Sequence, residues 1–366
     1  YYIIKYSFKE YFFNKRFIIL FKIATLCALG TGIQLLFLGS LLPIIFVFIM
    51  YLLLNKIKDY KKFLGDFALF FIIFYFILIL FWVDTHENIF TKPLEFFFKS
   101  FSESVGWPFN LVGGKYILSH ETPLNYLLIN YLYKLPEFVI FLYFLSIPII
   151  FWNFSELKRY FTNFKVLFFI FLILLVYPNL VIFLIPFPIY DGIRLFLWST
   201  PYLAIIPAII IYIIFRKKNI FFDISKFVLI FLFVFHFKNF LSITPYHYTF
   251  LNSFNGNKEF RYQKFENDYW STSLKELILN SNLNDKKITF VSCGVSPELT
   301  KIYMKKKYKM SEYKDIDNAK YIIMTNRTML SKKKEGITNC FDEFNFKNIS
   351  EVKRNGIILS AIKKMK

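Results

Sequence analysis

The stretch PFPIYDGIRLFLWSTPYLAIIPAIIIYII, residues 186–214, decides the fold of this chain. One apolar run, residues 166–185, ends where the stretch begins, and a second run, residues 195–215, makes up most of it. Each run has the roughly 20 apolar residues that carry a helix across a bilayer. The stretch therefore predicts two membrane-spanning helices joined by a short polar turn.

Four residues of this turn, Tyr190, Asp191, Gly192 and Arg194, are expected where lipid meets water. Ionisable side chains at that depth are costly unless they are paired or have a function, so the turn is a candidate site. The alternative is a turn whose acid and base pair with each other and anchor two helix ends. The spacing alone leaves both interpretations open.

The composition of the 366 residues indicates an α-helical polytopic membrane protein, because 56% of them are hydrophobic and 22% are aromatic. The formal charge of +20 would also suit a nucleic-acid partner. The lysines and arginines, however, fall mainly in the tail and in short loops between apolar runs, as the positive-inside rule describes. We therefore expect membrane lipids, and no nucleic acid, as partners.

About seven spans are expected, with the short basic loops on the cytoplasmic side. Residues 17–54 carry Lys22 as their only charge and are too numerous for one span, so they predict two spans with a turn near residues 30–39. The other five spans are predicted at residues 67–83, 138–154, 166–185, 195–215 and 227–243.

This topology divides the chain into three parts. Residues 1–16 are expected to form a cytoplasmic interfacial segment, residues 17–243 a transmembrane domain, and residues 244–366 a small extracytoplasmic α/β domain. Residues 84–134 are expected as a long external loop, because their acids outnumber their bases. A short amphipathic helix on the membrane surface is predicted within this loop at residues 93–101.

The tail has recognisable local signals. Residues 287–292 and 321–325 predict strands, residues 297–306 predict a helix between them, and Asn355 with Gly356 predicts a hairpin turn. Cys293 and Cys340 also lie in the tail. They would pair if the tail faces an oxidising compartment, but two cysteines do not define a disulfide framework.

Four segments, 106–136, 190–203, 244–256 and 265–276, are richer in polar residues than a membrane topology requires. Each segment contains one pattern: Gly114-Lys115 with Glu121, Pro123 and Tyr126; Asp191-Gly192-x-Arg194; Pro245-Tyr246 with Phe254-Asn255-Gly256; and Asp268-Tyr269-Trp270. This constellation resembles polyprenyl-phosphate-dependent membrane glycosyltransferases of the GT-C class, in particular the dolichyl-phosphate-mannose protein mannosyltransferase-like family. One departure is Leu195, where the family often has histidine after the arginine.

The resemblance implies transfer of a hexosyl or pentosyl group from a polyprenyl-phosphate sugar to a lipid, glycan or protein acceptor. The reaction would occur at the outer face of the cytoplasmic (inner) membrane, in the cell envelope. Such enzymes are expected to carry a catalytic acid pair in their first external loop, and residues 30–39 include no carboxylate. Either the catalytic acids lie upstream of Tyr1 or the chain is inactive alone. We favour the first alternative, in which this chain is the carboxy-terminal part of such an enzyme.

Transfer from a lipid phosphate needs donors for the developing phosphate charge, a base for the acceptor and surfaces for the sugar. Arg194 is the first candidate for the phosphate, and Lys115 is the second. The expected donor-phosphate or substrate-binding residues are Arg194, Asp191, Tyr190, Lys115, Glu121, Tyr246, Asp268 and Tyr269. For each of them the alternative is a structural role, as an ion pair, a helix cap, an interfacial aromatic or a solvated loop charge.

No metal-binding spacing, phosphate loop or dinucleotide fingerprint is found, so no metal or other cofactor is expected. A membrane transporter or lipid flippase is the competing class, and it predicts an internal repeat and charged or broken helices near the bilayer midplane. The sequence has no evident repeat, and its polar segments are all expected at one face. A third class is a non-catalytic scaffold that presents the tail to a partner.

Overall fold

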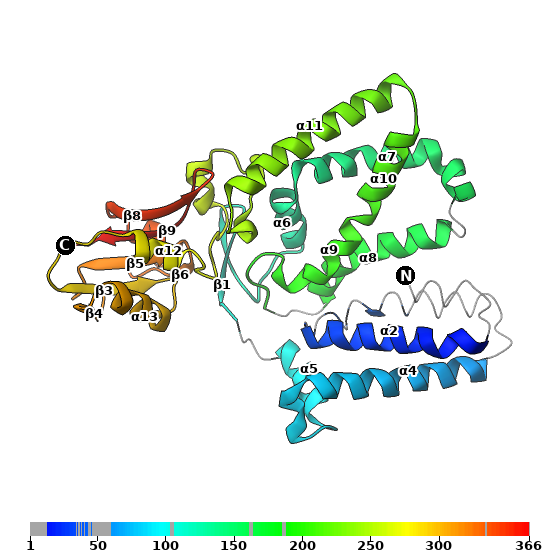
Figure 1. Cartoon of the computed structure of the whole chain (residues 1–366), viewed down its shortest axis with the longest axis horizontal. Helices are drawn as coiled ribbons and strands as arrows, with labels where there is room; N and C mark the ends of the chain where they lie inside the picture. The colour runs from blue at the N-terminus through cyan, green and yellow to red at the C-terminus, as the bar shows by residue number, and fades with distance from the viewer. Residues whose placement is uncertain are drawn as a thin grey trace. The chain divides into compact units, whose positions relative to one another are not determined.

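The computed structural model of this chain describes residues 13–33, 35, 37, 39, 41–42, 45, 60–102, 106–160, 164–184, 188–333 and 335–365 (Figure 1). Most of the predicted interfacial segment 1–16 and most of the second predicted span within residues 17–54 lie outside these residues. The chain divides into two compact units. Unit 1 comprises Tyr1–Val105, Asn153–Phe187 and Leu195–Ile205, and unit 2 comprises Gly106–Trp152, Pro188–Arg194 and Ile206–Lys366.

The described part of the chain is mostly helical and has four helices long and apolar enough to cross a membrane. These candidate spans are Leu64–Phe81, Glu137–Arg159, Arg194–Arg216 and Ile220–Ser242. Two further apolar helices, Phe17–Ile33 and Phe171–Leu184, are shorter. The expectation of a helical membrane protein is therefore confirmed, while the prediction of seven spans goes beyond these four.

In unit 1, helix α2 (Phe13–Ile33) packs against helix α4 (Tyr60–Phe81) (Figure 1). The small residues Ala24 and Ala28 are buried in this contact, and small side chains allow two helices to approach closely. Helix α5 (Lys92–Ser102) confirms the short helix predicted in the long loop. The other elements are the 3-10 turn η1 (Val83–Glu87), helices α8 (Phe164–Leu184) and α9 (Thr200–Leu203), and most of the 3-10 turn η2 (Arg194–Ser199).

Two of the membrane helices end in basic residues. Helix α7 (Glu137–Tyr160), which belongs to unit 2 up to Trp152 and to unit 1 from Asn153, has Lys158 and Arg159 in its last turn. Helices α10 (Ile205–Arg216) and α11 (Ile220–Ser242) are joined by a short turn in which the Asn219 side chain caps α11 (Figure 1). The turn itself begins with Lys217 and Lys218.

The tail contains a five-stranded sheet in the order β4-β3-β5-β9-β8. Strands β4 and β5 pair with β3 in parallel, whereas β9 pairs with β5 and with β8 in antiparallel register. The strands are β3 (Ile288–Cys293), β4 (Ser311–Tyr313), β5 (Tyr321–Thr325), β8 (Asn348–Arg354) and β9 (Ile357–Lys364). Helices α12 (Leu274–Asn280) and α13 (Pro297–Lys307) pack on this sheet, as does the short α14 (Cys340–Glu343).

The local predictions for the tail are confirmed. Strand β5 has the predicted bounds, β3 is shifted by one residue at each end, and α13 extends one residue beyond its predicted end. Asn355 and Gly356 adopt positive φ angles of 47° and 79° between β8 and β9, as a two-residue hairpin turn requires. Cys293 and Cys340 form a disulfide, which answers the question of pairing that the sequence left open.

A group of shorter elements connects the membrane helices of unit 2 to this sheet. They are strands β1 (Phe109–Val112), β2 (Lys115–Leu118), β6 (Thr328–Leu330) and β7 (Ile337–Asn339), helix α6 (Tyr126–Lys134), and the 3-10 turns η3 (His247–Thr249), η4 (Ser253–Asn255) and η5 (Lys258–Gln263). The buried Asn252 amide donates to the carbonyls of Leu132 and Leu135 at 2.7 and 2.8 Å. These bonds attach the chain after α11 to the junction of α6 and α7.

Candidate functional site

The turn before the candidate span Arg194–Arg216 has an uncommon backbone conformation, and hydrogen bonds hold it in place. Asp191 and Gly192 have φ angles of 59° and 68°, in the left-handed region that costs a residue with a Cβ atom free energy. The Asn110 amide donates to the Ile189 carbonyl at 2.5 Å, and the Tyr126 hydroxyl donates to the Gly192 carbonyl at 3.1 Å. Strand β1 and helix α6 therefore fix the direction of the Asp191 side chain.

Asp191 is 5% exposed and binds two arginines. Its Oδ2 atom lies 3.0 Å from Nη1 of Arg194, and its Oδ1 atom lies 2.5 Å from Nη1 of Arg327. The pairing of Asp191 with Arg194 is the structural alternative that the sequence left open. Arg327 was missed by the sequence analysis, and it comes from the connection between β5 and β6.

Glu266 is a second buried carboxylate at the same arginine. Its Oε2 atom lies 3.5 Å from Nη1 of Arg327, and its Oε1 atom accepts hydrogen bonds from the amide and hydroxyl of Thr328, both at 2.8 Å. Burial raises the pKa of Glu266, while Arg327 and the Thr328 donors oppose this rise. Arg327 thus lies between two carboxylates that come from distant parts of the sequence.

Aromatic rings accompany both arginines. The Arg327 guanidinium lies 4.6 Å from the ring centroid of Trp107, and the Arg194 guanidinium lies 4.2 Å from that of Trp270. Cation–π contacts at these distances are attractive, more so where the cation is desolvated. The Trp107 indole also donates to the Thr328 carbonyl at 2.9 Å, which fixes its ring. Each of the two arginines is therefore in contact with the ring of a tryptophan.

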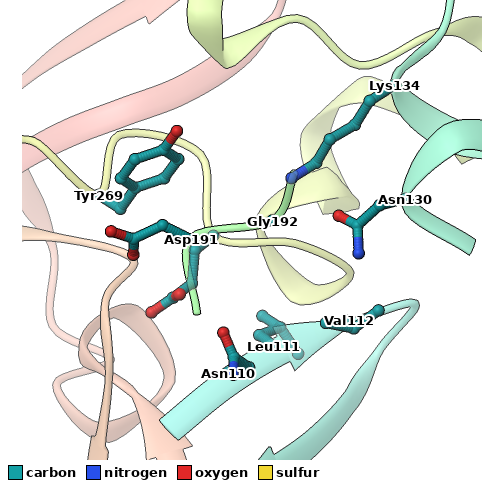
Figure 2. A pocket seen from close by; sticks show the side chains of 9 residues that line it. Asn110, Leu111, Val112, Asn130, Lys134, Asp191, Gly192 and Tyr269 are labelled. Atoms are coloured by element: carbon teal, nitrogen blue, oxygen red, sulfur yellow. The ribbon is translucent and has the colours of Figure 1, made fainter. Parts of the chain in front are cut away.

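A small pocket opens beside this cluster (Figure 2). Its lining residues are Asn110, Leu111, Val112, Asn130, Lys134, Asp191, Gly192, Glu266 and Tyr269. The cavity volume is about 10 Å³, close to the minimum that one water molecule needs. The pocket therefore has room for a single polar group of a ligand rather than for a whole ligand.

Lys134 and Tyr269 have shifted pKa values at this pocket. Burial lowers the pKa of Lys134 to about 8, against the opposing effect of Glu266 and Asp191. Burial raises the pKa of Tyr269 to about 12, and Asp191 adds to the rise. Lys134 forms no hydrogen bond or ion pair with another described residue, although its ammonium lies 5.3 Å from the Phe265 ring centroid. Neither Lys134 nor Glu266 was singled out from the sequence.

Of the eight predicted site residues, four gather here: Asp191, Arg194, Tyr190 and Tyr269. Asp191 and Tyr269 line the pocket, and the Arg194 guanidinium lies 5.9 Å from the Tyr190 ring centroid. Gly106 lies against the Tyr190 ring, since a Cβ atom there would come within 2.1 Å of a ring carbon.

The other four predicted residues are not among those that line the pocket. Lys115 is an exposed residue at the start of β2, and Glu121 is exposed beside His120. The Tyr246 hydroxyl donates to Glu276 at 2.7 Å. The expectation for Asp268 needs correction, because its carboxylate is fully buried and accepts hydrogen bonds from residues 248, 272 and 273. An acceptor substrate has no access to it.

Among the described residues, no group of three or more His, Cys, Asp or Glu side chains is arranged to hold a metal ion. Comparison of the chain with protein-family models, with curated proteins and with solved structures finds no match. The fold and the site therefore define the chain at the level of class: a helical membrane protein with a buried arginine–carboxylate cluster beside a polar pocket.

Proposed function

We propose that this chain is a membrane glycosyltransferase of the GT-C type that binds a polyprenyl-phosphate sugar at Arg194. It would transfer the sugar to a lipid, glycan or protein acceptor at the outer face of the cytoplasmic membrane. The observation that carries the proposal is the position of Arg194, at the first residue of a candidate span and against the exposed ring of Trp270.

Arg194 and Arg327 differ in their access to a ligand. The side chain of Arg194 is 35% exposed, whereas that of Arg327 is 8% exposed. Arginine presents a planar fork that matches two oxygens of a phosphate group. Arg194 therefore suits a lipid phosphate at the membrane boundary, and Arg327 suits the role of holding Asp191.

Aromatic side chains beside Arg194 supply surfaces for a sugar ring. Trp270 is 52% exposed, and Tyr190 and Tyr269 are partly exposed. A sugar attached to a phosphate at Arg194 would lie within reach of these rings. The apolar, outward-facing side chains of the spans are suited to the polyprenyl tail.

The orientation in the membrane is part of the proposal. Lys158 and Arg159 lie in the last turn of α7, and Lys217 and Lys218 follow α10; short basic segments between apolar helices fit a cytoplasmic location under the positive-inside rule. The disulfide between Cys293 and Cys340 fits a tail in an oxidising compartment. Both features favour the site facing outward, with the tail on the same side.

The proposal assigns donor binding to these residues and assigns no catalytic base among the described ones. Asp191 is 5% exposed and has an arginine on each carboxylate oxygen, so neither oxygen is open to the hydroxyl of an acceptor. The carboxylate that would take the acceptor proton was expected from the resemblance in a first external loop.

The test is transfer of a radiolabelled sugar from synthetic polyprenyl-phosphate mannose, glucose or arabinose in membranes that contain the full-length gene product, supplied with acceptor-bearing envelope lipids and peptides. We expect transfer by the wild type, a loss of about 100-fold or more in Arg194→Ala, and a smaller loss in Arg194→Lys, which keeps the charge but not the fork. Arg216→Ala, at the other end of the same span, is the matched control and should transfer normally.

Each variant is first checked for membrane insertion by protease protection and for a single peak in detergent size exclusion. Absence of wild-type transfer from all three donors would refute the glycosyltransferase proposal. Equal transfer by wild type and Arg194→Ala would remove Arg194 from the donor site.

A further inference from the structure

We infer that Asn130, Lys134 and Gly192 form a subsite that receives one hydroxyl group of a sugar. The inference deepens the proposed function and rests on it for the identity of the sugar, which would be the one transferred. It does not concern the phosphate site at Arg194, and it is carried by different atoms.

Asn130 is fully buried and has an oxygen without a partner. Its Nδ2 atom donates to the Tyr126 carbonyl at 2.9 Å, whereas its Oδ1 atom accepts no hydrogen bond from any described residue. Asn130 lines the pocket, with its side chain directed toward the open space beside Gly192 (Figure 2). Buried acceptors are nearly always satisfied, so an unpartnered one in a pocket indicates a missing donor.

The Lys134 ammonium lies beside the same point. A Cβ atom built on Gly192 would come within 2.1 Å of Lys134 Nζ and 3.2 Å of Asn130 Oδ1. The Lys134 ammonium therefore lies over the bare Cα of Gly192, and one donor and one acceptor lie close together in the lining of the same pocket. A hydroxyl group can accept a hydrogen bond from the ammonium and donate one to the amide oxygen at the same time.

The charge of the lining argues against a phosphate in this space. Besides Lys134, the polar lining includes the carboxylates of Asp191 and Glu266 and the amide oxygen of Asn130, all of which are acceptors. A phosphate oxygen would meet the Asn130 oxygen with no proton to donate. The cavity of about 10 Å³ is also too small for a phosphate group, whereas one hydroxyl fits.

Tyr269 extends the subsite toward the aromatic residues. It lines the same pocket, and its ring lies 6.2 Å from that of Trp270, which in turn contacts Arg194. A continuous path of partly exposed groups thus leads from the proposed phosphate site to the pocket. A sugar ring between the two would place one of its hydroxyls at Asn130 and Lys134.

The experiment compares a series of singly deoxygenated sugars in two assays. The first measures kcat/KM for transfer from polyprenyl-phosphate donors in which each hydroxyl is removed in turn. The second measures binding of the corresponding methyl glycosides by tryptophan fluorescence, which needs no transfer. The proteins are wild type, Asn130→Leu and Lys134→Met, with Asn125→Leu and Lys275→Met as controls at exposed positions.

With wild type and both controls, we expect removal of one particular hydroxyl to lower kcat/KM by about 100-fold or more, because the pocket atoms are then left unpaired. In Asn130→Leu and Lys134→Met the same removal should cost less than about fivefold, since the pocket no longer requires that hydroxyl. Lys134→Met, which removes only the donor, keeps the test valid if the leucine variant does not fold.

The outcomes separate the subsite from the reaction. Normal wild-type transfer with no deoxygenated sugar discriminated would overturn the subsite and leave the glycosyltransferase proposal intact. Glycoside binding that Asn130→Leu and Lys134→Met abolish, without transfer by wild type, would support the subsite and overturn the reaction. Binding that neither variant alters would assign the pocket to a structural water molecule and overturn the inference.

Discussion

Arg327 Nη1 lies 2.5 Å from Asp191 Oδ1, although the two residues are 136 positions apart in the sequence. This contact joins the connection after β5 to the turn that precedes the candidate span Arg194–Arg216. The other carboxylate oxygen of Asp191 is bound by Arg194. The buried Arg327 therefore holds Asp191 in place, and Asp191 in turn positions the partly exposed Arg194.

Arg327→Ala should destabilise unit 2 by about 3–5 kcal/mol, because it leaves Asp191 and Glu266 buried without their shared cation. Equilibrium urea unfolding in detergent measures this change. Lys287→Ala removes one partner of an exposed ion pair with Glu312 and should cost less than about 1 kcal/mol. Equal decreases in unfolding free energy for the two variants would show that the buried ion pairs of Arg327 contribute no more to stability than an exposed pair does.

The sequence could predict the parts of this cluster that lie close together along the chain. Asp191 and Arg194 are three positions apart, and their pairing follows from that spacing. The hairpin at Asn355 and Gly356 likewise needs only its own two residues and the strands beside them. Such features depend on local backbone geometry, which a short sequence motif is enough to predict.

The partners from distant segments could not be predicted in the same way. Arg327, Glu266 and Lys134 come from three segments whose approach depends on the packing of the whole unit. One signal was present for Arg327, which follows the predicted strand 321–325 by two residues. Polar residues just beyond the carboxyl ends of parallel strands often belong to sites. No comparable signal marked Lys134, which looked like one more loop charge.

Gly192→Ala should move the Lys134 ammonium, because the added methyl group would lie 2.1 Å from Nζ. Gly113→Ala is a matched control, since Gly113 has a similar φ of 59° and its nearest atom, on Ile129, is 3.6 Å away. Both changes should cost about 1–2 kcal/mol through the left-handed backbone. Only Gly192→Ala should also weaken glycoside binding, measured by tryptophan fluorescence. A matching loss of binding in Gly113→Ala would contradict the role of the Lys134 position.

Removal of the disulfide by Cys293→Ser with Cys340→Ser should destabilise the tail by about 2–4 kcal/mol, because the bond closes a loop of 47 residues. The Cys340 amide donates to the Arg327 carbonyl at 3.0 Å. If Cys340 is less firmly fixed, we expect Arg327 to be less firmly fixed too, and its ion pair with Asp191 to weaken. Urea unfolding of the double variant and of reduced wild type should give the same midpoint. An unchanged midpoint in both would mean that the bond does not form in the native protein.

Reporter fusions after Arg159 and Lys217 should report the cytoplasm, and a fusion after Lys286 should report the outside. The reason is the basic residues in the last turn of α7 and directly after α10, which the positive-inside rule assigns to the cytoplasm. A membrane-impermeant maleimide, applied to intact cells after reduction, should label Cys293 or Cys340. A cytoplasmic signal after Lys286 would reverse the orientation and place the Arg194 site on the inner face.

Lys134→Met should make the protein more stable at neutral pH, and the gain should fade as the pH rises. Lys134 has a pKa of about 8 in the folded protein and an ordinary value of 10.5, so the folded state binds its proton less tightly. Below pH 8 both states hold the proton, and the folded state bears the full cost of burying the cation beside Val112 and Leu111 despite the nearby Asp191 and Glu266. Between pH 8 and 10.5 the unfolded state holds more protons, so rising pH stabilises the wild type, by at most about 1.4 kcal/mol per pH unit.

The measurement is the difference in unfolding free energy between Lys134→Met and wild type from pH 6 to pH 11. We expect a constant advantage for the methionine variant up to about pH 8, then a decline that ends near pH 10.5. Lys115→Met, at an exposed position, should show no such decline. A methionine variant that is less stable than wild type at pH 7 would mean that Lys134 is stabilised by a partner in the native protein, and the pocket would then not be open to a sugar hydroxyl.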